Sequence, residues 1–336
     1  MEQNVKKAKR KPGSKALRNH VERVRFIIQS LFFILTNSFI TGFLKGTIYK
    51  GNLKYVCVPG LNCYSCPGAV GSCPIGALQA IFNTPDFGKS GNGLYAPLYY
   101  IPFYLIGMLM VFGVICGRLI CGLLCPFGLV QDLIYKIPLK KIKKVPGDKY
   151  LRYLKYVILV VFVILLPMLF GIGNVPYAPW FCKYICPSGT LIGGIPLMTI
   201  GGDVSWAQAG NLTILKLSIL FVLIVLSIFI YRPFCKYLCP LGAIYSFFNK
   251  VSFYKFYVDE SKCSRCNGKS SACSACKTAC RMGVDIVKTP NALECIRCGD
   301  CKAACPNSAI VSGFKPNPNL KKDKGAFNKA ETTNIN

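Results

Sequence analysis

The chain has 336 residues, of which 52% are hydrophobic, and it carries 41 Lys and Arg against 13 Asp and Glu, together with 20 cysteines. These totals argue against a secreted disulfide scaffold, because such proteins are short and loop-rich, whereas this chain has several apolar runs of membrane-spanning length. A nucleic-acid-binding protein would account for the net charge of +28 but not for those runs. The composition therefore indicates a multi-pass membrane protein with basic cytoplasmic segments.

The first 25 residues are strongly basic and lack a small-residue cleavage site after a short apolar core. We interpret residues 1–25 as a basic cytoplasmic tail and not as a removable signal peptide. Four apolar runs then predict membrane-spanning helices at about residues 26–44, 95–116, 151–171 and 211–231, each long enough to cross roughly 30 Å of hydrocarbon. Together they form a predicted transmembrane domain over residues 26–256.

The orientation follows from the Lys and Arg residues between these spans. Residues 1–25 hold nine of them, residues 117–150 hold seven and residues 232–336 hold seventeen, against four in residues 45–94 and one in residues 172–210. Basic segments stay inside the cell. We therefore expect a prokaryotic cell-membrane protein with both termini in the cytoplasm and with the two poorly basic loops facing outward.

A Cys-Pro-x-Gly sequence and a short apolar stretch recur four times, beginning at Cys73, Cys125, Cys186 and Cys239. We interpret the repeated unit as a span, a Cys-Pro turn and a short helix. Proline at the first helical position places the cysteine at the helix start, where the dipole and the free amide groups favour a thiolate. Because successive spans alternate in direction, the first and third turns should lie outside and the second and fourth inside.

Three of the turns carry a second cysteine in a C-x3-C-P pattern, at Cys121, Cys182 and Cys235. The two inner turns supply four thiols, enough to hold one [4Fe–4S] cluster, and we predict an inner cluster on Cys121, Cys125, Cys235 and Cys239. The first and third turns should pair in the same way. We therefore predict an outer cluster on Cys66, Cys73, Cys182 and Cys186.

The outer cysteines have an alternative role. Cys57 and Cys63 bring their number to six on an oxidising face, and six thiols also suffice for three disulfides. Cys116 lies inside a predicted span, and we expect it to take part in ordinary packing.

Residues 257–312 are predicted to form an α+β domain of the bacterial ferredoxin type with two [4Fe–4S] clusters. Their second cysteine run reads C-x2-C-x2-C-x3-C-P, a pattern in which the fourth thiolate ligates the other cluster. We therefore assign Cys263, Cys266, Cys276 and Cys305 to one cluster and Cys295, Cys298, Cys301 and Cys280 to the other. Cys273 is the spare thiol, because Cys276 keeps the usual spacing to Cys280. Structural zinc is the alternative, although zinc prefers two separated C-x2-C pairs.

Residues 313–336 contain too few apolar groups to fold, and we predict a disordered tail. The only histidine, His20, lies in the basic tail, so the sequence offers neither two haem-ligating histidines nor a C-x2-C-H attachment site. We also find no nucleophile–base constellation and predict no catalytic residues. The residue set supports electron transfer through iron–sulfur clusters.

The C-x3-C-P turns after membrane spans, joined to a C-terminal double-cluster ferredoxin, resemble the membrane polyferredoxin family that includes NapH, NosR and the CcoG proteins. The resemblance covers roughly residues 95–310. It implies cluster ligands in "CGLLC", "CKYIC" and "CKYLC" and in the two ferredoxin runs. It also implies electron transfer between cytoplasmic or quinone donors and extracytoplasmic acceptors, or a role in maturing respiratory metalloenzymes. This chain differs in having three such turns where two are usual and in the additional cysteines at 57–73.

We therefore predict an electron carrier that links redox proteins on the two sides of the membrane, with lipid around it, quinone as a further candidate partner and no nucleic acid. Two alternatives stay open at this point. One is a maturation or assembly factor for a respiratory metalloenzyme, and the other is a scaffold with disulfides outside and zinc inside.

Overall fold

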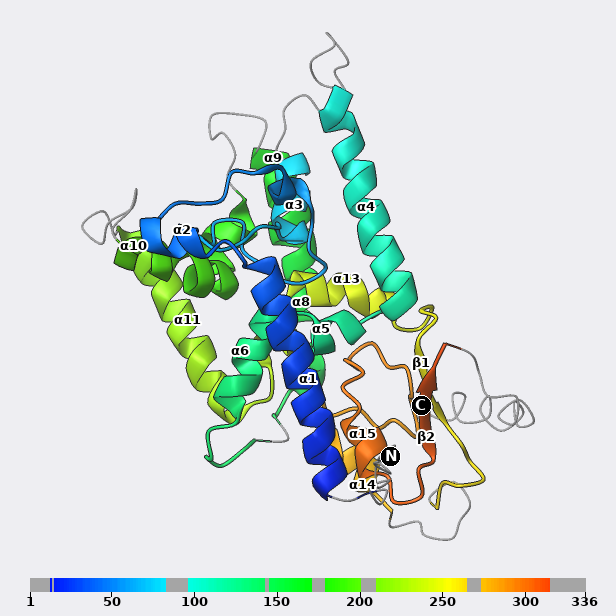
Figure 1. Ribbon diagram of the computed structural model, residues 1–336. Coiled ribbons are helices and arrows are strands. Elements are labelled where there is room, and N and C mark those ends of the chain that lie inside the picture. Colours follow the sequence, from blue (N-terminus) through cyan, green and yellow to red (C-terminus); the bar gives the residue numbers. More distant parts are fainter. Residues whose placement is uncertain are drawn as a thin grey trace, which may run out of the picture.

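The computed structural model of the chain describes residues 13, 15–82, 96–142, 145–170, 179–200, 210–264 and 273–314. Its elements, drawn in Figure 1, are α1 (Lys15–Thr36), α2 (Ile40–Lys45), η1 (Asn52–Tyr55), α3 (Pro74–Phe82), α4 (Ala96–Cys116), α5 (Leu119–Leu123), α6 (Pro126–Tyr135), α7 (Asp148–Leu151), α8 (Leu154–Ile158), η2 (Leu159–Leu165), α9 (Leu166–Phe170), η3 (Phe181–Ile185), η4 (Gly189–Gly194), α10 (Ile195–Ile200), α11 (Asn211–Phe229), α12 (Pro233–Tyr237), α13 (Pro240–Phe248), β1 (Lys255–Val258), α14 (Ala275–Ala279), α15 (Asp300–Ala304) and β2 (Ile310–Gly313). η1 is a 3-10 helix, and η2, η3 and η4 are π-helices.

Long helices form the middle of the molecule, and shorter elements close it at both ends (Figure 1). α1, α4 and α11 run along the long direction. α2, α3, α9 and α10 gather at one end, which we call the α3 end, and α14, α15, β1 and β2 lie at the opposite end. The described N-terminal and C-terminal ends both lie with the second group.

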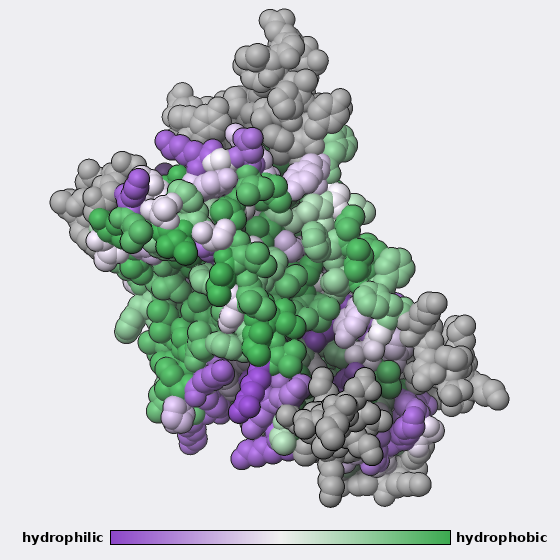
Figure 2. Space-filling model, viewed as in Figure 1, coloured by the Kyte–Doolittle hydropathy of each residue, from purple (hydrophilic) through white to green (hydrophobic). Residues whose placement is uncertain are grey.

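The middle of the molecule has an apolar exterior. Figure 2 shows hydrophobic side chains gathered in a band across the visible face, with hydrophilic side chains toward both ends. Among the outward-pointing residues are Leu35 at 69% exposure, Val157 at 52% and Phe221 at 67%. A continuous apolar surface on long helices is the kind of surface that a lipid bilayer covers.

Two helical runs in the described part of the chain are long and apolar enough to cross a membrane, Asp148–Leu169 and Asn211–Phe229. They correspond to the spans predicted at 151–171 and 211–231. The span predicted at 95–116 coincides with α4, in which Phe103–Cys116 forms a shorter apolar helix.

The span predicted at 26–44 is not one helix. α1 ends at Thr36, three residues are not helical, and α2 begins at Ile40. Local hydrogen bonds explain the interruption, because the Thr36 hydroxyl donates to the Phe32 carbonyl at 2.8 Å and the Asn37 side-chain amide donates to the Phe33 carbonyl at 3.0 Å. Side chains that bond nearby carbonyls in this way offer the backbone an alternative to the helix.

The tail predicted over residues 1–25 is helical from Lys15 onward. This half of α1 packs beside α15, and Glu22 forms an ion pair with Arg281 of the C-terminal part. Contacts with the C-terminal part of the chain therefore hold residues 15–25 in place, and the composition of these residues alone does not predict those contacts. Residues 1–12 and 14 lie outside the described residues.

The C-terminal module is an antiparallel pair of strands with two short helices. β1 pairs with β2 in a register that joins Lys255 to Gly313 and Val258 to Ile310. α14 and α15 pack against each other, so the module contains both helices and strands over about the predicted range 257–312. The predicted disordered tail, 313–336, lies outside the described residues apart from Gly313 and Phe314.

Charged groups and a close backbone contact dock this module onto the helices. Glu294 accepts a hydrogen bond from Arg118 at 2.9 Å and pairs with Lys155, and all three side chains are largely buried. A Cβ atom on Gly122 would lie only 2.5 Å from the Ile296 carbonyl oxygen. The absence of a side chain at Gly122 is therefore what lets the module approach α5.

We predict that Gly122→Val weakens this docking. Overpacking a close contact costs roughly 1–3 kcal/mol, so the variant should unfold at a lower temperature and should be cut faster by protease near residue 255. Gly107→Val is the matched control, because a Cβ atom there meets nothing within 4 Å. Equal melting temperatures for the two variants would contradict the docking contact.

Candidate metal centres

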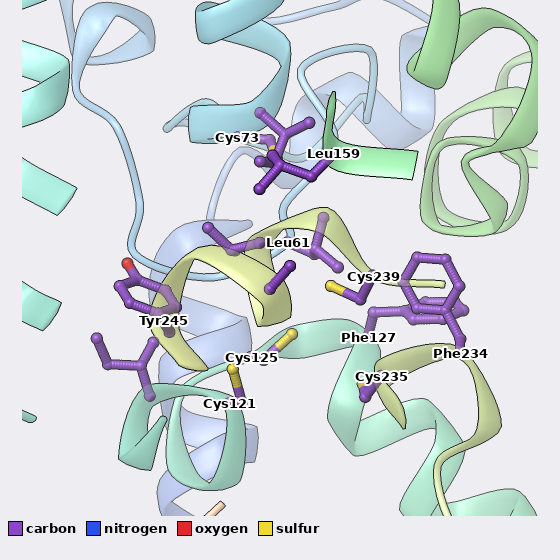
Figure 3. Packing of buried hydrophobic residues seen from close by; sticks show 14 of the residues in the cluster. Leu61, Cys73, Cys121, Cys125, Phe127, Leu159, Phe234, Cys235, Cys239 and Tyr245 are labelled. Atoms are coloured by element: carbon purple, nitrogen blue, oxygen red, sulfur yellow. The ribbon is translucent and has the colours of Figure 1, made fainter. Parts of the chain in front are cut away.

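Four buried cysteines from two distant parts of the chain meet beside the C-terminal module. We call Cys121, Cys125, Cys235 and Cys239 the inner set. Figure 3 shows Cys121 and Cys125 on one side of a shared space and Cys235 and Cys239 on the other. These are the four residues that the sequence analysis assigned to one cluster.

Electrostatics also indicates that these sulfurs are neighbours. Burial raises the pKa of the Cys239 thiol well above its ordinary value, and the Cys235, Cys121 and Cys125 sulfurs raise it further. Burial and the Cys125 sulfur raise the pKa of Cys235 to about 12. Because iron binds the thiolate form, binding metal at this set releases protons.

The Cys-Pro turns place their sulfurs as the sequence pattern predicts. Cys125 and Cys239 are the N-cap residues of α6 and α13, and proline occupies the first turn of both helices. The amide of Gly242 donates to the Cys239 sulfur at 3.3 Å, and that of Gly189 donates to the Cys186 sulfur at 3.4 Å. Each helix start therefore offers a sulfur and an amide donor to the same site.

Two fully buried arginines cross between the halves of the inner set. Arg118 donates to the Cys235 carbonyl at 3.2 Å, and Arg232 donates to the Cys121 carbonyl. A Cβ atom on Gly128 would lie 3.1 Å from the Arg232 guanidinium, so the glycine of this Cys-Pro-x-Gly turn leaves room for it. Both guanidinium groups are also paired with carboxylates, Arg118 with Glu294 and Arg232 with Asp132, so they join the two halves of the inner set through backbone carbonyls while their own charge is balanced.

A second group of four thiols lies toward the α3 end. We call Cys63, Cys73, Cys182 and Cys186 the outer set. Burial raises the pKa of Cys182 well above its ordinary value, and the Cys186, Cys73 and Cys63 sulfurs raise it further. The Cys63 sulfur lies against η4, since a Cβ atom on Gly193 would be 3.2 Å from it and one on Gly189 would be 3.6 Å from it.

Cys66, which the sequence analysis placed in the outer set, points elsewhere. Its side chain is fully buried, donates to the Asn37 side-chain oxygen at 3.4 Å and packs with Ala69 and Ile192. Cys63 takes its place beside the other three thiols. Asn37 lies at the interrupted end of α1, so the Cys66 thiol is bonded to that end, and we propose Cys63 as the fourth outer ligand in its place.

The outer set surrounds a cavity of about 960 Å³. Lys54, Lys216 and Cys57 also line it, and Cys57 lies 3.6 Å from the Ser72 hydroxyl. The Ser188 hydroxyl on the wall is buried and has no hydrogen-bond partner within the described residues. Four thiols, two cations and an unpaired donor fit an anionic group that accepts hydrogen bonds, as a [4Fe–4S] cluster does.

In the module, Cys263, Cys276 and Cys305 line one small cavity of about 20 Å³. Cys266, their predicted companion, lies outside the described residues. Cys273, the thiol taken as spare, lies on the same wall. We call Cys263, Cys266, Cys276 and Cys305 the distal module set.

The other four module cysteines, Cys280, Cys295, Cys298 and Cys301, form what we call the proximal module set. Burial raises the pKa of Cys301, and the Cys295 and Cys280 sulfurs raise it further. Cys280 and Cys305 each accept an amide hydrogen bond at 3.3 Å from the residue four positions later, Val284 and Ala309. In the structure Cys280 lies near Cys301, and Cys305 shares a cavity wall with Cys263 and Cys276.

Every described cysteine is a free thiol. Among the same residues, no three His, Cys, Asp or Glu side chains converge on a point where a single metal ion could bind.

Sequence reasoning chose Cys66 over Cys63 and did not single out the two arginines. A signal existed for the arginines, because Arg118 and Arg232 each stand three residues before the first cysteine of an inner C-x3-C motif, where the outer motif has Pro179. For Cys63 and Cys66 the spacing carried no such signal.

Comparison with known proteins agrees with the position of the inner set. The 4Fe-4S binding domain family matches residues 100–145 and 212–256, two segments that hold the two halves of that set. The uncharacterized protein MJ0750 of Methanocaldococcus jannaschii is 32% identical over 211 residues, which cover 62% of this chain and 76% of that protein.

Two further relatives have informative names. The protein named "Putative electron transport protein YccM" of Escherichia coli is 23% identical over 239 residues, covering 67% of this chain and 58% of YccM. "Regulatory protein NosR" of Pseudomonas aeruginosa is 27% identical over 185 residues, covering 54% of this chain and 23% of NosR. No solved structure matches the chain.

Asp132→Asn should destabilise the protein strongly. Asp132 accepts hydrogen bonds from Arg232 at 2.8 Å and from Arg25 at 3.2 Å. The variant leaves the buried Arg232 without its anion and leaves Arg25 only Asp300 at 4.0 Å, at a cost of about 3–5 kcal/mol. Asp259→Asn, which loses a pair with the 60% exposed Lys262, should cost at most about 1 kcal/mol. Denaturant unfolding in detergent measures both, and equal losses would contradict the assignment.

The same carboxylate predicts acid sensitivity. Burial alone would raise the pKa of Asp132, but Arg232 and Arg25 outweigh burial and hold it below its usual value. The contribution is therefore complete above the unfolded pKa of about 3.9 and is lost as the pH falls through the lower folded pKa. Wild-type stability should drop below about pH 4, and Asp132→Asn should lack that component.

Cys63→Ser and Cys66→Ser should differ in iron content. If Cys63 is the outer ligand, Cys63→Ser loses about four iron atoms per chain, whereas Cys66→Ser keeps the wild-type number. Iron and acid-labile sulfide in anaerobically purified protein measure the difference. The reverse result would restore Cys66 to the outer set.

Proposed function

Because the chain belongs to the membrane polyferredoxin family, whose members bind 4Fe-4S clusters, we propose that it conducts electrons across the membrane through clusters held by its four cysteine sets. The observation that carries this proposal is that the inner set has the module on one side, where Cys280 and Cys298 pack against its core, and on the other the loop at residues 60–63 that leads to the outer set. The bound clusters supply one-electron chemistry. The words "electron transport" in the name of YccM support the same function.

The contact between the module and the inner set supports the first part of this route. Cys298 and Cys280 pack against the same core as the inner set, and Ile296, between Cys295 and Cys298, touches Gly122 beside Cys121. Glu294, next to Cys295, holds Arg118, which in turn holds the Cys235 carbonyl. These contacts hold the module against the inner set.

One loop connects the inner and outer sets. A Cβ atom on Gly60 would lie 3.1 Å from the Cys125 Cα atom, and the Leu61 backbone lies close enough to the Cys125 sulfur to lower the pKa of that thiol, against the larger effect of burial. Leu61 also lines the outer cavity, and two residues later comes Cys63. The chain thus passes from one set to the other in four residues, and Tyr245, which donates to the Pro59 carbonyl at 3.1 Å, fixes the loop.

We propose four spans in the membrane, formed by the second half of α1 together with the loop and α2 that follow it, by α4, by the run from α7 to α9, and by α11. The distribution of Lys and Arg supports a cytoplasmic module and cytoplasmic termini, with the outer set on the far side. The redox partner of the module would then be a cytoplasmic protein or a quinone-linked donor, and the outer set would serve an extracytoplasmic acceptor.

The first test is the metal content of anaerobically purified protein. Four clusters require about sixteen iron atoms and as many acid-labile sulfides per chain, and Cys125→Ser should lose about four of each. Zinc without acid-labile sulfide would overturn the proposed function.

The second test is transport. Vesicles that contain the protein and trapped dithionite should reduce external ferricyanide faster than protein-free vesicles, and Cys125→Ser should remove the difference. A wild-type protein that carries its full iron content but reduces ferricyanide no faster than empty vesicles would exclude transmembrane conduction.

A further inference from the structure

Two buried glutamines occupy equivalent positions in the inner and outer sets. Gln79 and Gln131 both stand six residues after the cysteine of a Cys-Pro turn, in "CPIGALQ" and "CPFGLVQ". They are 0% and 2% exposed. A primary amide in an apolar core costs free energy unless all its polar atoms are bonded, so its partners explain its presence.

The partners are the same at both sites. Gln131 Nε2 donates to the Cys235 sulfur at 3.1 Å, and its Oε1 accepts from the Phe234 amide at 3.2 Å. Gln79 Nε2 donates to the Cys182 sulfur at 3.3 Å, and its Oε1 accepts from the Phe181 amide at 2.9 Å.

The second N–H of each amide also has a matched partner. Gln131 donates it to the Phe127 carbonyl at 3.4 Å and Gln79 to the Ile75 carbonyl at 3.1 Å, in each case the residue four positions earlier. The orientation of both amides is therefore fixed. An oxygen must face the phenylalanine N–H, so the NH₂ group must face the sulfur.

We infer that Gln131 and Gln79 are matched positioning residues, each of which holds the first thiolate of the facing C-x3-C segment. Gln131 sets the reduction potential of the inner cluster in this way, and Gln79 that of the outer cluster. This inference rests on the proposed function. An N–H donor to a ligating sulfur disperses negative charge and favours the reduced cluster, which is the more anionic state. The turns that begin at Cys186 and Cys239 carry Ile192 and Tyr245 at the corresponding position, so each site has one such donor from its glutamine turn.

Redox titration of the full-length protein, followed by electron paramagnetic resonance, tests the inference. Gln131→Glu keeps the oxygen that bonds the Phe234 amide but loses the N–H donor once the carboxyl ionises. The midpoint potential of the inner cluster should then fall. At a fixed applied potential the ratio of reduced to oxidised cluster should change at least tenfold, which corresponds to about 59 mV for one electron. Gln79→Glu should shift the outer midpoint alone.

A pH series separates hydrogen bonding from packing. A neutral glutamic acid can donate again, so the midpoint in Gln131→Glu should fall as the pH rises through the carboxyl pKa, more steeply than in the wild type. Gln131→Leu should show a lowered midpoint at every pH. Gln29→Leu is the control, because Gln29 is a buried amide that donates to the Gly122 carbonyl at 3.0 Å and to no sulfur in the described part of the chain.

The outcomes are distinct. Cys125→Ser and Cys63→Ser identify the inner and outer signals, and if the wild type lacks them the proposed function fails first. If both Gln131 variants lose about four iron atoms while the outer signal and the Gln29→Leu iron content are kept, the positioning role is supported. If the variants bind full iron and every midpoint matches the wild type, the inference is overturned.

Discussion

The fold depends on a reciprocal contact between two buried arginines and two cysteines. Each arginine donates a hydrogen bond to the backbone carbonyl of the cysteine that stands three residues after the other arginine. Arg118 reaches Cys235 and Arg232 reaches Cys121, so neither half of the inner set is complete alone. Buried cations need anions, and the chain supplies Asp132 from α6 and Glu294 from the C-terminal module. Because Glu294 adjoins Cys295, the charge balance of the inner set and the position of the module are fixed by the same interactions.

The two membrane-domain sites share a construction but differ in their surroundings. Both set a glutamine-bearing Cys-Pro turn against a Phe-Cys-x3-Cys segment, which explains why the four-fold repeat produces two sites. The inner set is enclosed by arginines at 0% exposure. The outer set borders a cavity of about 960 Å³ with Lys54 and Lys216 on its wall. The cavity leaves space beside the outer set in which a partner could bind, whereas the inner set is in contact with the module and the connecting loop.

Local signals predicted much of this arrangement. The helices at 148–169 and 211–229 follow from the length of apolar runs, and the inner set follows from proline that fixes a cysteine at a helix start. Tertiary contacts decided the rest. Cys63 and Cys66 belong to one C-x2-C pair, and in the structure the Cys66 thiol bonds Asn37 whereas the Cys63 thiol lies near Cys73, Cys182 and Cys186. The order in residues 15–25 depends on contacts with the C-terminal module. One of them is the ion pair of Glu22 with Arg281, which lies more than 250 positions later in the sequence.

The early end of α1 and the link between the two sites are one feature. A non-helical loop in the apolar middle of a membrane protein is tolerated only where protein groups satisfy its backbone. The Thr36 carbonyl, free because the helix stops there, accepts hydrogen bonds from the Val70 amide at 3.0 Å and the Asn62 side chain at 3.3 Å. Val58 and Ser72 pair across the same loop at 2.9 Å. If α1 had continued through residue 44, the Thr36 carbonyl would have been bonded within the helix. The loop that brings Leu61 close to the Cys125 sulfur would then have lost its hydrogen bonds to Thr36.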